Sequence, residues 1–186
     1  MSIIHKDIAS IREDYSKFKL DEHGVSENPI LQFQRWFDEA LRSNVIEPTA
    51  MVISTISVDG FPSARVVLLK DIKPNGFSFF TNYDSKKGIS IAHCDKVSLL
   101  FFWPELQRQV RIEGIAEKLP EQDSDEYFAL RPKSSRLGAL ASPQSSIIRD
   151  RNFLQSRIDA LQSQYALTDD VPRPNNWGGY LVIPVR

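Results

Sequence analysis

Cysteine is almost missing from the sequence, which has one, Cys94, in 186 residues. No intramolecular disulfide can form, which argues against a secreted disulfide scaffold. The three histidines, His5, His23 and His93, lack paired spacing, so no metal site is predicted. No Gly-x-Ser-x-Gly elbow and no Walker phosphate loop occur either. Nothing suggests Ser-His-Asp catalysis, although the sequence leaves it open. If the chain is an enzyme, we expect a bound cofactor to carry the chemistry.

Long apolar runs are also absent, so no membrane span is predicted. The first residues, Met1 to Asp7, do not read as a signal peptide. The formal net charge is only -1, with 25% charged residues, and nothing global favours nucleic acid or an anionic membrane as a partner. A cytoplasmic protein is expected, and any anion site must be a local cluster of basic residues.

The middle of the chain has the composition of β-strands joined by tight turns. Val58-Asp59-Gly60-Phe61 predicts a hairpin turn, and Lys73 to Gly76 predicts a second turn. Gly114 is a candidate β-bulge. The predicted strands are Ala50 to Ser57, Pro62 to Lys70, Phe77 to Thr81, Val97 to Trp103, Arg108 to Lys118 and Leu181 to Val185.

Helices are predicted on both sides of this region. Asn28-Pro29 is a good helix start, with Asn28 as N-cap and Pro29 in the first turn. Ile8, Ile11, Tyr15 and Phe18 recur at helical spacing in a very polar segment, which indicates a marginal helix or an arm. Further helices are predicted over Lys86 to His93, Asp123 to Leu130, Ser134 to Leu140 and the segment marked by Leu154, Ile158, Leu161 and Tyr165.

Short strands in series favour an antiparallel sheet curled into a small barrel with peripheral helices, an α+β fold that is mainly β. Strands and helices do not alternate and no Gly-x-Gly-x-x-Gly turn occurs, which argues against a Rossmann domain. We expect an N-terminal arm over residues 1–27 and a single domain over residues 28–186.

Basic and hydroxyl residues stand at the ends of several predicted elements. Arg65 and Lys70 bracket an apolar strand, and Ser85-Lys86-Lys87 opens a helix where a phosphate can bind. Taken singly, each feature has an alternative explanation. Arg65 and Lys70 could be the charged ends of an ordinary strand, and Lys86 and Lys87 could be a solvated surface pair. In a regular strand the side chains of Arg65 and Lys70 would point to opposite faces of the sheet, because the residues are five apart. A bulge, or use of two subunits, would reconcile them, and we predict the second.

Tyr127 and Arg131 are four residues apart, so they share one helix face if the helix reaches Arg131. Pro132 suits the opening of a following helix near Ser135. Tyrosine, arginine and hydroxyl would then converge on a phosphate monoester. Alternatively, Arg131 caps the carbonyls of the first helix. Gln144-Ser145-Ser146 is a polar loop with donors, and Trp177-Gly178-Gly179 places a ring beside glycines that permit close approach.

Taken together and in order, these segments resemble the pyridoxamine 5'-phosphate oxidase family. The resemblance runs from about the N-terminal helix to the last residues. It is carried by the strings Pro48-Thr49-Ala50-Met51-Val52, Arg65-Val66-Val67-Leu68-Leu69-Lys70, Phe80-Thr81-Asn82, Ser85-Lys86-Lys87, Val97-Ser98-Leu99-Leu100-Phe101, Arg108-Gln109-Val110, Tyr127-Phe128, Arg131-Pro132, Gln144-Ser145-Ser146 and Trp177-Gly178-Gly179.

The resemblance implies a split β-barrel homodimer with flavin mononucleotide (FMN) at the subunit interface. It implies that the substrate is bound by Lys70, Tyr127, Arg131 and Ser135, under a lid with Arg12 and Tyr15. It also implies FMN contacts from Arg65, Val66, Val67, Leu68, Lys70, Phe80, Thr81, Ser85, Lys86, Lys87, Gln109, Gln144, Ser145 and Trp177.

The implied activity is FMN-dependent oxidation of pyridoxamine or pyridoxine 5'-phosphate to pyridoxal 5'-phosphate, with O2 as acceptor and H2O2 as product. The family also carries an Arg-Leu-His-Asp-Arg segment after the last strand, whereas this sequence ends at Pro184-Val185-Arg186. Weakened substrate affinity and a slower hydride step are therefore expected. The alternatives are a flavin-binding split barrel without this turnover, an activity-impaired truncated oxidase, and, among other split barrels, a flavin reductase or haem-binding protein.

Overall fold

The computed structural model describes residues 14–16 and 19–186, which fall into two compact units. The first unit contains residues up to Pro48 together with Phe102–Gln109, and the second contains Thr49–Phe101 and Val110–Arg186. Most of the predicted arm, including Arg12, lies outside the described residues. Within the part that is described, no helix is both long and apolar enough to cross a membrane.

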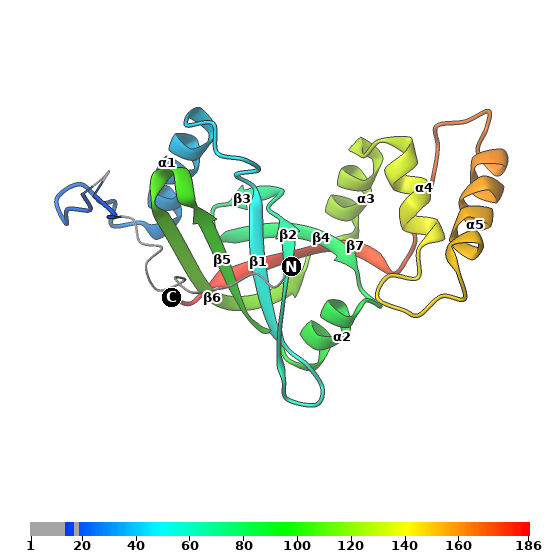
Figure 1. Cartoon of the computed structure of the whole chain (residues 1–186), viewed down its shortest axis with the longest axis horizontal. Coiled ribbons are helices and arrows are strands. Elements are labelled where there is room, and N and C mark those ends of the chain that lie inside the picture. Colours follow the sequence, from blue (N-terminus) through cyan, green and yellow to red (C-terminus); the bar gives the residue numbers. More distant parts are fainter. Residues whose placement is uncertain (1–13, 17–18) are drawn as a thin grey trace, which may run out of the picture. The chain divides into compact units, whose positions relative to one another are not determined.

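The first unit is built on helix α1 (Pro29–Arg42), labelled in Figure 1. The predicted start is confirmed, because the Asn28 side chain accepts hydrogen bonds from the Ile30 and Leu31 amides and Pro29 opens the first turn. Phe33 on this helix stacks with Phe37 at 5.9 Å between ring centroids and contacts Trp103 at the same spacing. These rings form the unit's core.

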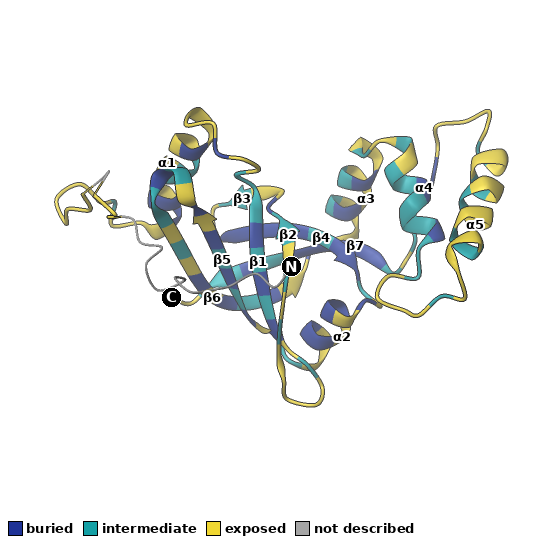
Figure 2. Ribbon diagram, viewed as in Figure 1, coloured by how far each residue is buried: buried dark blue, intermediate teal, exposed yellow. Residues whose placement is uncertain are grey.

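The second unit is organised by a curled antiparallel sheet, which confirms the split-barrel prediction (Figure 1). In the described residues the sheet has seven strands in the order β2-β1-β5-β6-β7-β4-β3. Figure 2 shows β4 and β7 buried along most of their length. The strands are β1 (Ala50–Ile56), β2 (Pro62–Leu68), β3 (Asp71–Lys73), β4 (Gly76–Asn82), β5 (Lys96–Trp103), β6 (Arg108–Lys118) and β7 (Trp177–Pro184).

Turn chemistry explains the first hairpin. Strands β1 and β2 pair from Ala50↔Leu68 to Ile56↔Pro62, and Gly60 between them has a φ of 84°. Glycine adopts this left-handed backbone without steric cost, so the predicted turn at Val58 to Phe61 is confirmed. Strand β2 ends at Leu68, two residues earlier than predicted, and the short strand β3 was not predicted.

The helices of the second unit match the predicted positions closely. Helix α2 (Lys86–His93) has the predicted bounds, and the Ser85 side chain caps it by accepting from the Gly88 amide. Phe128, Leu137, Val171 and Trp177 form a small core among the later helices, with Leu161 and Tyr165 packed against it. Those helices are α3 (Glu121–Leu130), α4 (Lys133–Ala141) and α5 (Arg151–Gln164), and Figure 2 shows α5 to be mostly exposed.

Gly114 does not mark a bulge against β7, because the β6–β7 register runs one-to-one from Gly114↔Pro184 to Lys118↔Tyr180. The glycine is required by close packing instead. A Cβ atom at this position would overlap the carbonyl oxygen of Ile183 and press on the side chain of Val182. Since backbone atoms of a paired strand cannot move aside cheaply, a larger residue must distort the sheet.

Gly114→Ala is expected to lower the free energy of unfolding by about 2 kcal/mol, because the new methyl group overpacks the sheet against β7. Urea denaturation followed by circular dichroism measures the change. Gly138→Ala is the matched control. This glycine lies inside α4 with open space around its Cβ position, so the same substitution should raise stability by about 0.5–1 kcal/mol. Equal effects of the two variants would contradict the packing explanation.

Candidate functional site

The second unit contains a cavity of about 890 Å³, within the range typical of sites for small molecules and cofactors. Its walls are formed by the ends of several elements of the second unit. These are strand β2 and the segment after it, the end of β4, the end of α3, and the starts of α2, α4 and β7. The predicted site residues that line it are Arg65, Val66, Val67, Leu68, Lys70, Phe80, Thr81, Lys86, Lys87, Tyr127, Arg131, Ser135, Gln144, Ser145 and Trp177.

The charge of this cavity has one sign. Five cationic side chains line it, Arg65, Lys70, Lys86, Lys87 and Arg131, and no carboxylate does. In the described part of the chain, none of the five forms a salt bridge to an acidic side chain. A chain with a net charge of -1 therefore concentrates uncompensated positive charge at one place. Such a cavity attracts an anionic ligand.

One group of these residues is joined by hydrogen bonds at the base of α2. The Lys87 ammonium donates to Thr81 Oγ1 at 2.9 Å and to Ser85 Oγ at 3.4 Å. Only 8% of Lys87 is exposed to solvent. Burial, and secondly the charge of Arg65, lower the pKa of Lys87. Burial also lowers the pKa of Arg65. Both shifts have the same main cause, since burial disfavours the charged form of these two side chains.

A second group surrounds Arg131. Its guanidinium lies over the Trp177 ring, 4.7 Å from the centroid, and 5.5 Å from the centroid of Phe128. Its Nη1 atom is buried without a hydrogen-bond partner, and burial lowers the pKa of Arg131. A buried, unpaired guanidinium nitrogen is costly, so this donor is suited to an anion entering the cavity.

The route by which Tyr127, Arg131 and Ser135 come together differs from the predicted one. Helix α3 ends at Leu130, and Arg131 is extended (φ -72°, ψ 146°), as the following Pro132 favours. Tyr127 and Arg131 therefore do not share one helix face, although both line the cavity. The alternative in which Arg131 caps α3 is confirmed for its backbone, whose amide donates to the Phe128 carbonyl at 3.2 Å, whereas its guanidinium stacks on aromatic rings.

Arg65 and Lys70 reach the same cavity although a regular strand would point them to opposite faces. The regular strand ends at Leu68, so the alternation of faces does not extend to Lys70. Both residues line the same cavity of a single chain. The prediction that a second subunit is needed to bring them together is therefore wrong.

Three predicted residues in the described part of the chain, Ser85, Gln109 and Tyr15, do not line this cavity. Ser85 is fully buried as the cap of α2, and its hydroxyl donates to the Asn82 carbonyl at 2.6 Å. The same hydroxyl accepts from Lys87, so Ser85 supports a lining residue from behind the cavity wall. Gln109 belongs to the first compact unit, at the start of β6. Arg12 lies outside the described residues. Tyr15 also belongs to the first unit and is 76% exposed, so it is not part of an apolar helix face.

The loop after α4 reaches the cavity with an unusual backbone. Ser145 has a φ of 67°, a left-handed conformation that costs a residue with a Cβ about 1 kcal/mol or more. The neighbouring Gln144 accepts a hydrogen bond from the Asn82 amide at 3.4 Å, next to Thr81. Strain of this kind often accompanies binding sites, and here it falls on a residue that lines the cavity.

Aromatic rings form an apolar part of the cavity wall. Phe80 stacks with Tyr127 at 3.9 Å and with Trp177 at 5.5 Å between centroids. The glycines after Trp177 do permit close approach, as predicted, but the groups that approach belong to the chain itself. A Cβ on Gly178 would overlap the Tyr83 hydroxyl, and one on Gly179 would press on Phe80.

Sequence reasoning missed some contributors. Ser63, Leu130 and Pro132 also line the cavity. Ser63 lies two residues before Arg65 in the same strand, so period-two spacing could have placed both on one face. Thr55, on the neighbouring strand β1, accepts a hydrogen bond from Arg65 Nη1 at 2.9 Å. Its part depends on strand register, which single-sequence patterns do not provide.

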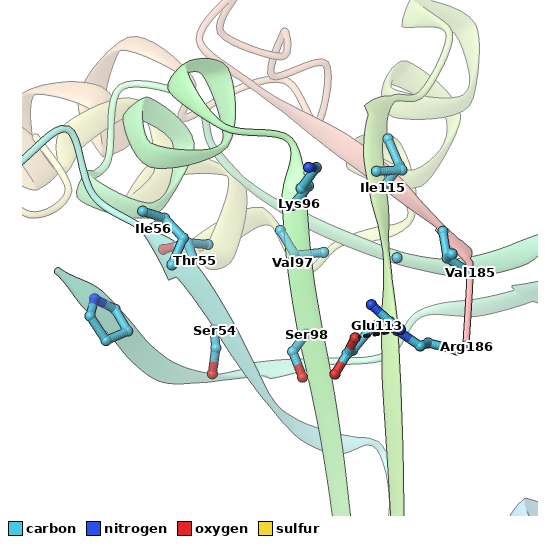
Figure 3. A pocket seen from close by; sticks show the side chains of 12 residues that line it. Ser54, Thr55, Ile56, Lys96, Val97, Ser98, Glu113, Ile115, Val185 and Arg186 are labelled. Atoms are coloured by element: carbon cyan, nitrogen blue, oxygen red, sulfur yellow. Dashed lines mark hydrogen bonds and ion pairs between the residues drawn. The ribbon is translucent and has the colours of Figure 1, made fainter. Parts of the chain in front are cut away.

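A second cavity, of about 470 Å³, lies elsewhere in the same unit and is shown in Figure 3. Figure 3 shows Ser54, Ser98 and Glu113 side by side on neighbouring strands. Its lining is mainly apolar, and Arg186 is paired with Glu113 at 2.7 Å. Because it lacks a cluster of unpaired charges, we assign the candidate site to the larger, cationic cavity.

Lys87→Met is expected to stabilise the ligand-free protein by about 1 kcal/mol at pH 7, because it removes a charge that is poorly solvated. The pKa of Lys87 is depressed in the folded state, so the cost of its charge is fully present below that folded value. The cost falls as pH rises from there and disappears above the ordinary pKa of 10.5. The wild type should therefore approach the variant in stability at high pH.

Urea denaturation of the ligand-free protein at several pH values measures this difference. Lys86→Met is the control, since Lys86 lines the same cavity but is exposed, and its removal should change stability by less than about 0.5 kcal/mol. Inorganic phosphate should raise the melting temperature of the wild type more than that of Lys87→Met. A destabilised Lys87→Met protein would contradict the electrostatic argument.

Comparison with known proteins identifies the family. The family model described as pyridoxamine 5'-phosphate oxidase matches residues 37–165. A pyridoxine/pyridoxamine 5'-phosphate oxidase of Haemophilus ducreyi is 51% identical over 180 residues, 97% of this chain and 85% of that protein. Proteins of the same name from Neisseria meningitidis and Salinibacter ruber are 51% and 45% identical, each over 96% of this chain and over 84% and 83% of their own lengths.

Solved structures agree with this result. PhzG from Burkholderia lata, crystallised with tetrahydrophenazine-1-carboxylic acid, has a TM-score of 0.84 and 29% identity, over 90% of this chain and 82% of that one. A pyridoxamine 5'-phosphate oxidase-related, FMN-binding protein from Nostoc punctiforme shares the fold, with a TM-score of 0.65 and 14% identity over 90% of this chain and 84% of that one. The chain therefore belongs to the pyridoxamine 5'-phosphate oxidase family.

Proposed function

We propose that the protein is an FMN-dependent oxidase that converts pyridoxamine or pyridoxine 5'-phosphate to pyridoxal 5'-phosphate, with O2 as acceptor and H2O2 as product. The observation that carries the proposal is the group of five cations without a carboxylate in one cavity. The names of the relatives, which are about half identical to this chain, support the choice of substrate.

The charge of the cavity fits two phosphate monoesters better than one. A monoester carries about -1.5 to -2 at neutral pH, so FMN and a B6 phosphate together bring about -3 to -4. The five lining cations supply the opposite charge in nearly matching amount. A single monoester would leave about three cations uncompensated in a partly buried place, which is unfavourable.

The residues at the base of α2 fit the FMN phosphate. Lys87 is hydrogen-bonded to Thr81 there, and Arg65 is near enough for its charge to lower the pKa of Lys87. The α2 N-terminus adds amide donors beside them. Lys86 and Ser145 line the same cavity and would hold the phosphate and ribityl chain, while Gln144 and Trp177 would contact the ring. The lowered pKa of Lys87 means that a bound dianion also relieves an existing electrostatic cost.

The residues around Arg131 fit the substrate phosphate. Arg131 offers its unpaired Nη1, and Tyr127, Ser135 and Lys70 line the cavity with it. When bound, FMN would supply the two-electron acceptor for this oxidation, with O2 as the final acceptor. The protein's task is orientation, since contacts to a remote phosphate can fix the position of the reacting carbon.

The same proposal includes a homodimer with FMN near the interface. Outward positions of β1 and the edge strand β2 carry no charge, and the register places Val66, Val52 and Leu100 in one row across three strands. Val66 is 65% exposed in the single chain and also lines the cationic cavity. An uncharged, partly apolar sheet face that adjoins a ligand cavity is suited to a second copy of the chain.

Arg131→Met should raise the KM for pyridoxine 5'-phosphate about 100-fold, because a buried charge-assisted contact to the phosphate is lost. The Kd for FMN should change by less than about threefold. Steady-state H2O2 production and flavin fluorescence measure these quantities. Arg157→Met is the control, since Arg157 lies on α5 away from the cavity and its loss should leave both quantities unchanged.

The wild-type protein provides the direct test of function. It should take up FMN, and adding pyridoxine 5'-phosphate without O2 should bleach the flavin absorbance. FMN uptake without bleaching would favour a flavin-binding protein that lacks this turnover. A protein that cannot take up FMN would refute the proposal.

Ala64→Glu should convert the dimer to monomers, because Ala64 lies on the outward side of β2, opposite Ser54, and the charge would be buried between two copies. Light scattering after size-exclusion chromatography measures the mass. Leu167→Glu places the same acid at a fully exposed apolar residue and should leave the mass unchanged. A monomeric wild type, or a dimer that tolerates Ala64→Glu, would rule out this interface.

A further inference from the structure

The guanidinium of Arg65 is held by residues that the family resemblance does not assign to the site, one of which, Ser63, also lines the cavity. Its Nη1 donates to Thr55 Oγ1 at 2.9 Å, to the Ser63 carbonyl at 2.8 Å and to the Ile53 carbonyl at 3.3 Å. Its Nη2 donates to Ser63 Oγ at 2.6 Å. One end of the guanidinium is therefore engaged by two neighbouring strands.

Strand register explains how these groups meet. Ile53 is opposite Arg65, and Thr55 is opposite Ser63, in the β1–β2 pairing. Residues two apart on a strand face the same side, so Thr55, Ser63 and Arg65 share one face of the hairpin. The Arg65 side chain lies back along this face over the Thr55–Ser63 pair.

The bonds that are made determine which donors remain. A guanidinium has five N–H groups. The protein uses those of Nη1 and one of Nη2, which leaves the Nε hydrogen and the second Nη2 hydrogen. Because the carbonyl and the hydroxyl of one residue, Ser63, accept from Nη1 and Nη2, these bonds lie at the end of the planar group, which leaves the two remaining hydrogens together on its Nε edge. That edge matches two oxygens of a phosphate.

We infer that Thr55 and Ser63 are positioning residues for the phosphate of the cofactor, since they fix Arg65 with its bidentate edge free for the anion. The inference rests on the proposed FMN site. Neither residue needs to touch the phosphate. They lower the ordering cost of an arginine side chain, which would otherwise lose rotamer freedom when the ligand binds.

The burial of Thr55 supports this role over a purely structural one. Only 1% of the residue is exposed, so its hydroxyl is out of contact with solvent. A valine would fill the same volume without a polar atom, and packing alone gives no reason for a hydroxyl. The acceptor that this hydroxyl provides is used by Arg65.

The test compares Thr55→Val with Thr55→Ser, measuring the Kd of FMN and of riboflavin, which lacks the phosphate, by quenching of flavin fluorescence. Thr55→Val should weaken FMN binding about tenfold while riboflavin binding stays within about twofold. Thr55→Ser keeps the hydroxyl and should restore FMN affinity. Ser78→Ala, at an equally buried hydroxyl on β4 away from Arg65, should change neither affinity.

A double-mutant cycle shows whether Thr55 acts through Arg65. In an Arg65→Met background, Thr55→Val should have almost no further effect on FMN binding. Thr55 also lines the second cavity, and an effect through that cavity would persist in this background. Persistence of the effect, an equal loss of riboflavin affinity, or unchanged FMN binding by Thr55→Val would each overturn the inference.

Ser63→Ala provides an independent arm if Thr55→Val does not fold. It removes the acceptor of Nη2 from a partly exposed strand position, and it should weaken FMN but not riboflavin binding. Failure of the proposed function gives a different result, in which the wild type itself binds no FMN. If the wild type binds FMN and all hydroxyl variants bind it equally, only the positioning role is refuted.

Discussion

The structure depends on one electrostatic constraint, which is that five cations share a cavity that no carboxylate lines. Three of them, Arg65, Lys87 and Arg131, are held by neutral groups instead. Thr81 and Ser85 accept hydrogen bonds from Lys87, while Thr55, Ser63 and backbone carbonyls accept from Arg65. The Arg131 guanidinium is supported by the ring of Trp177. Neutral acceptors and rings fix the position of a cation without cancelling its charge, so the attraction for an anion is preserved.

The fold supplies these groups from the ends of its elements. The edge strand β2, the last residues of β4, the starts of α2 and α4 and the start of β7 all reach one cavity, and all lie in the second compact unit. Fully buried residues of β4 and β7, such as Phe79 and Val182, form the core beneath these strands. The loop at Ser145 then needs a left-handed residue to reach the same place.

Local patterns predicted the elements well, because they depend on periodicity and caps. At Asn28-Pro29 and at Ser85, for example, a capping residue next to the helix determines where the helix starts. Most lining residues were found by resemblance of ordered motifs. What failed depends on three-dimensional register or on where an element ends. Because β2 ends early, at Leu68, Lys70 lines the same cavity as Arg65. Arg131 lies after the end of α3 in an extended conformation. The contact of Thr55 with Arg65 depends on the pairing of Thr55 with Ser63 across two strands.

The unbalanced charge also has a consequence for the life of the protein in a cell. Ligand binding to the folded state alone shifts the unfolding equilibrium by mass action. Without a bound anion, the repulsion between Arg65 and Lys87 is uncompensated and lowers the free energy of unfolding. The ligand-free form therefore populates unfolded states more than the ligand-bound form. Proteases act on those states. The number of molecules that persist is therefore tied to the supply of the anion that fills the cavity, and scarcity of that small molecule would deplete the protein without any change in its synthesis.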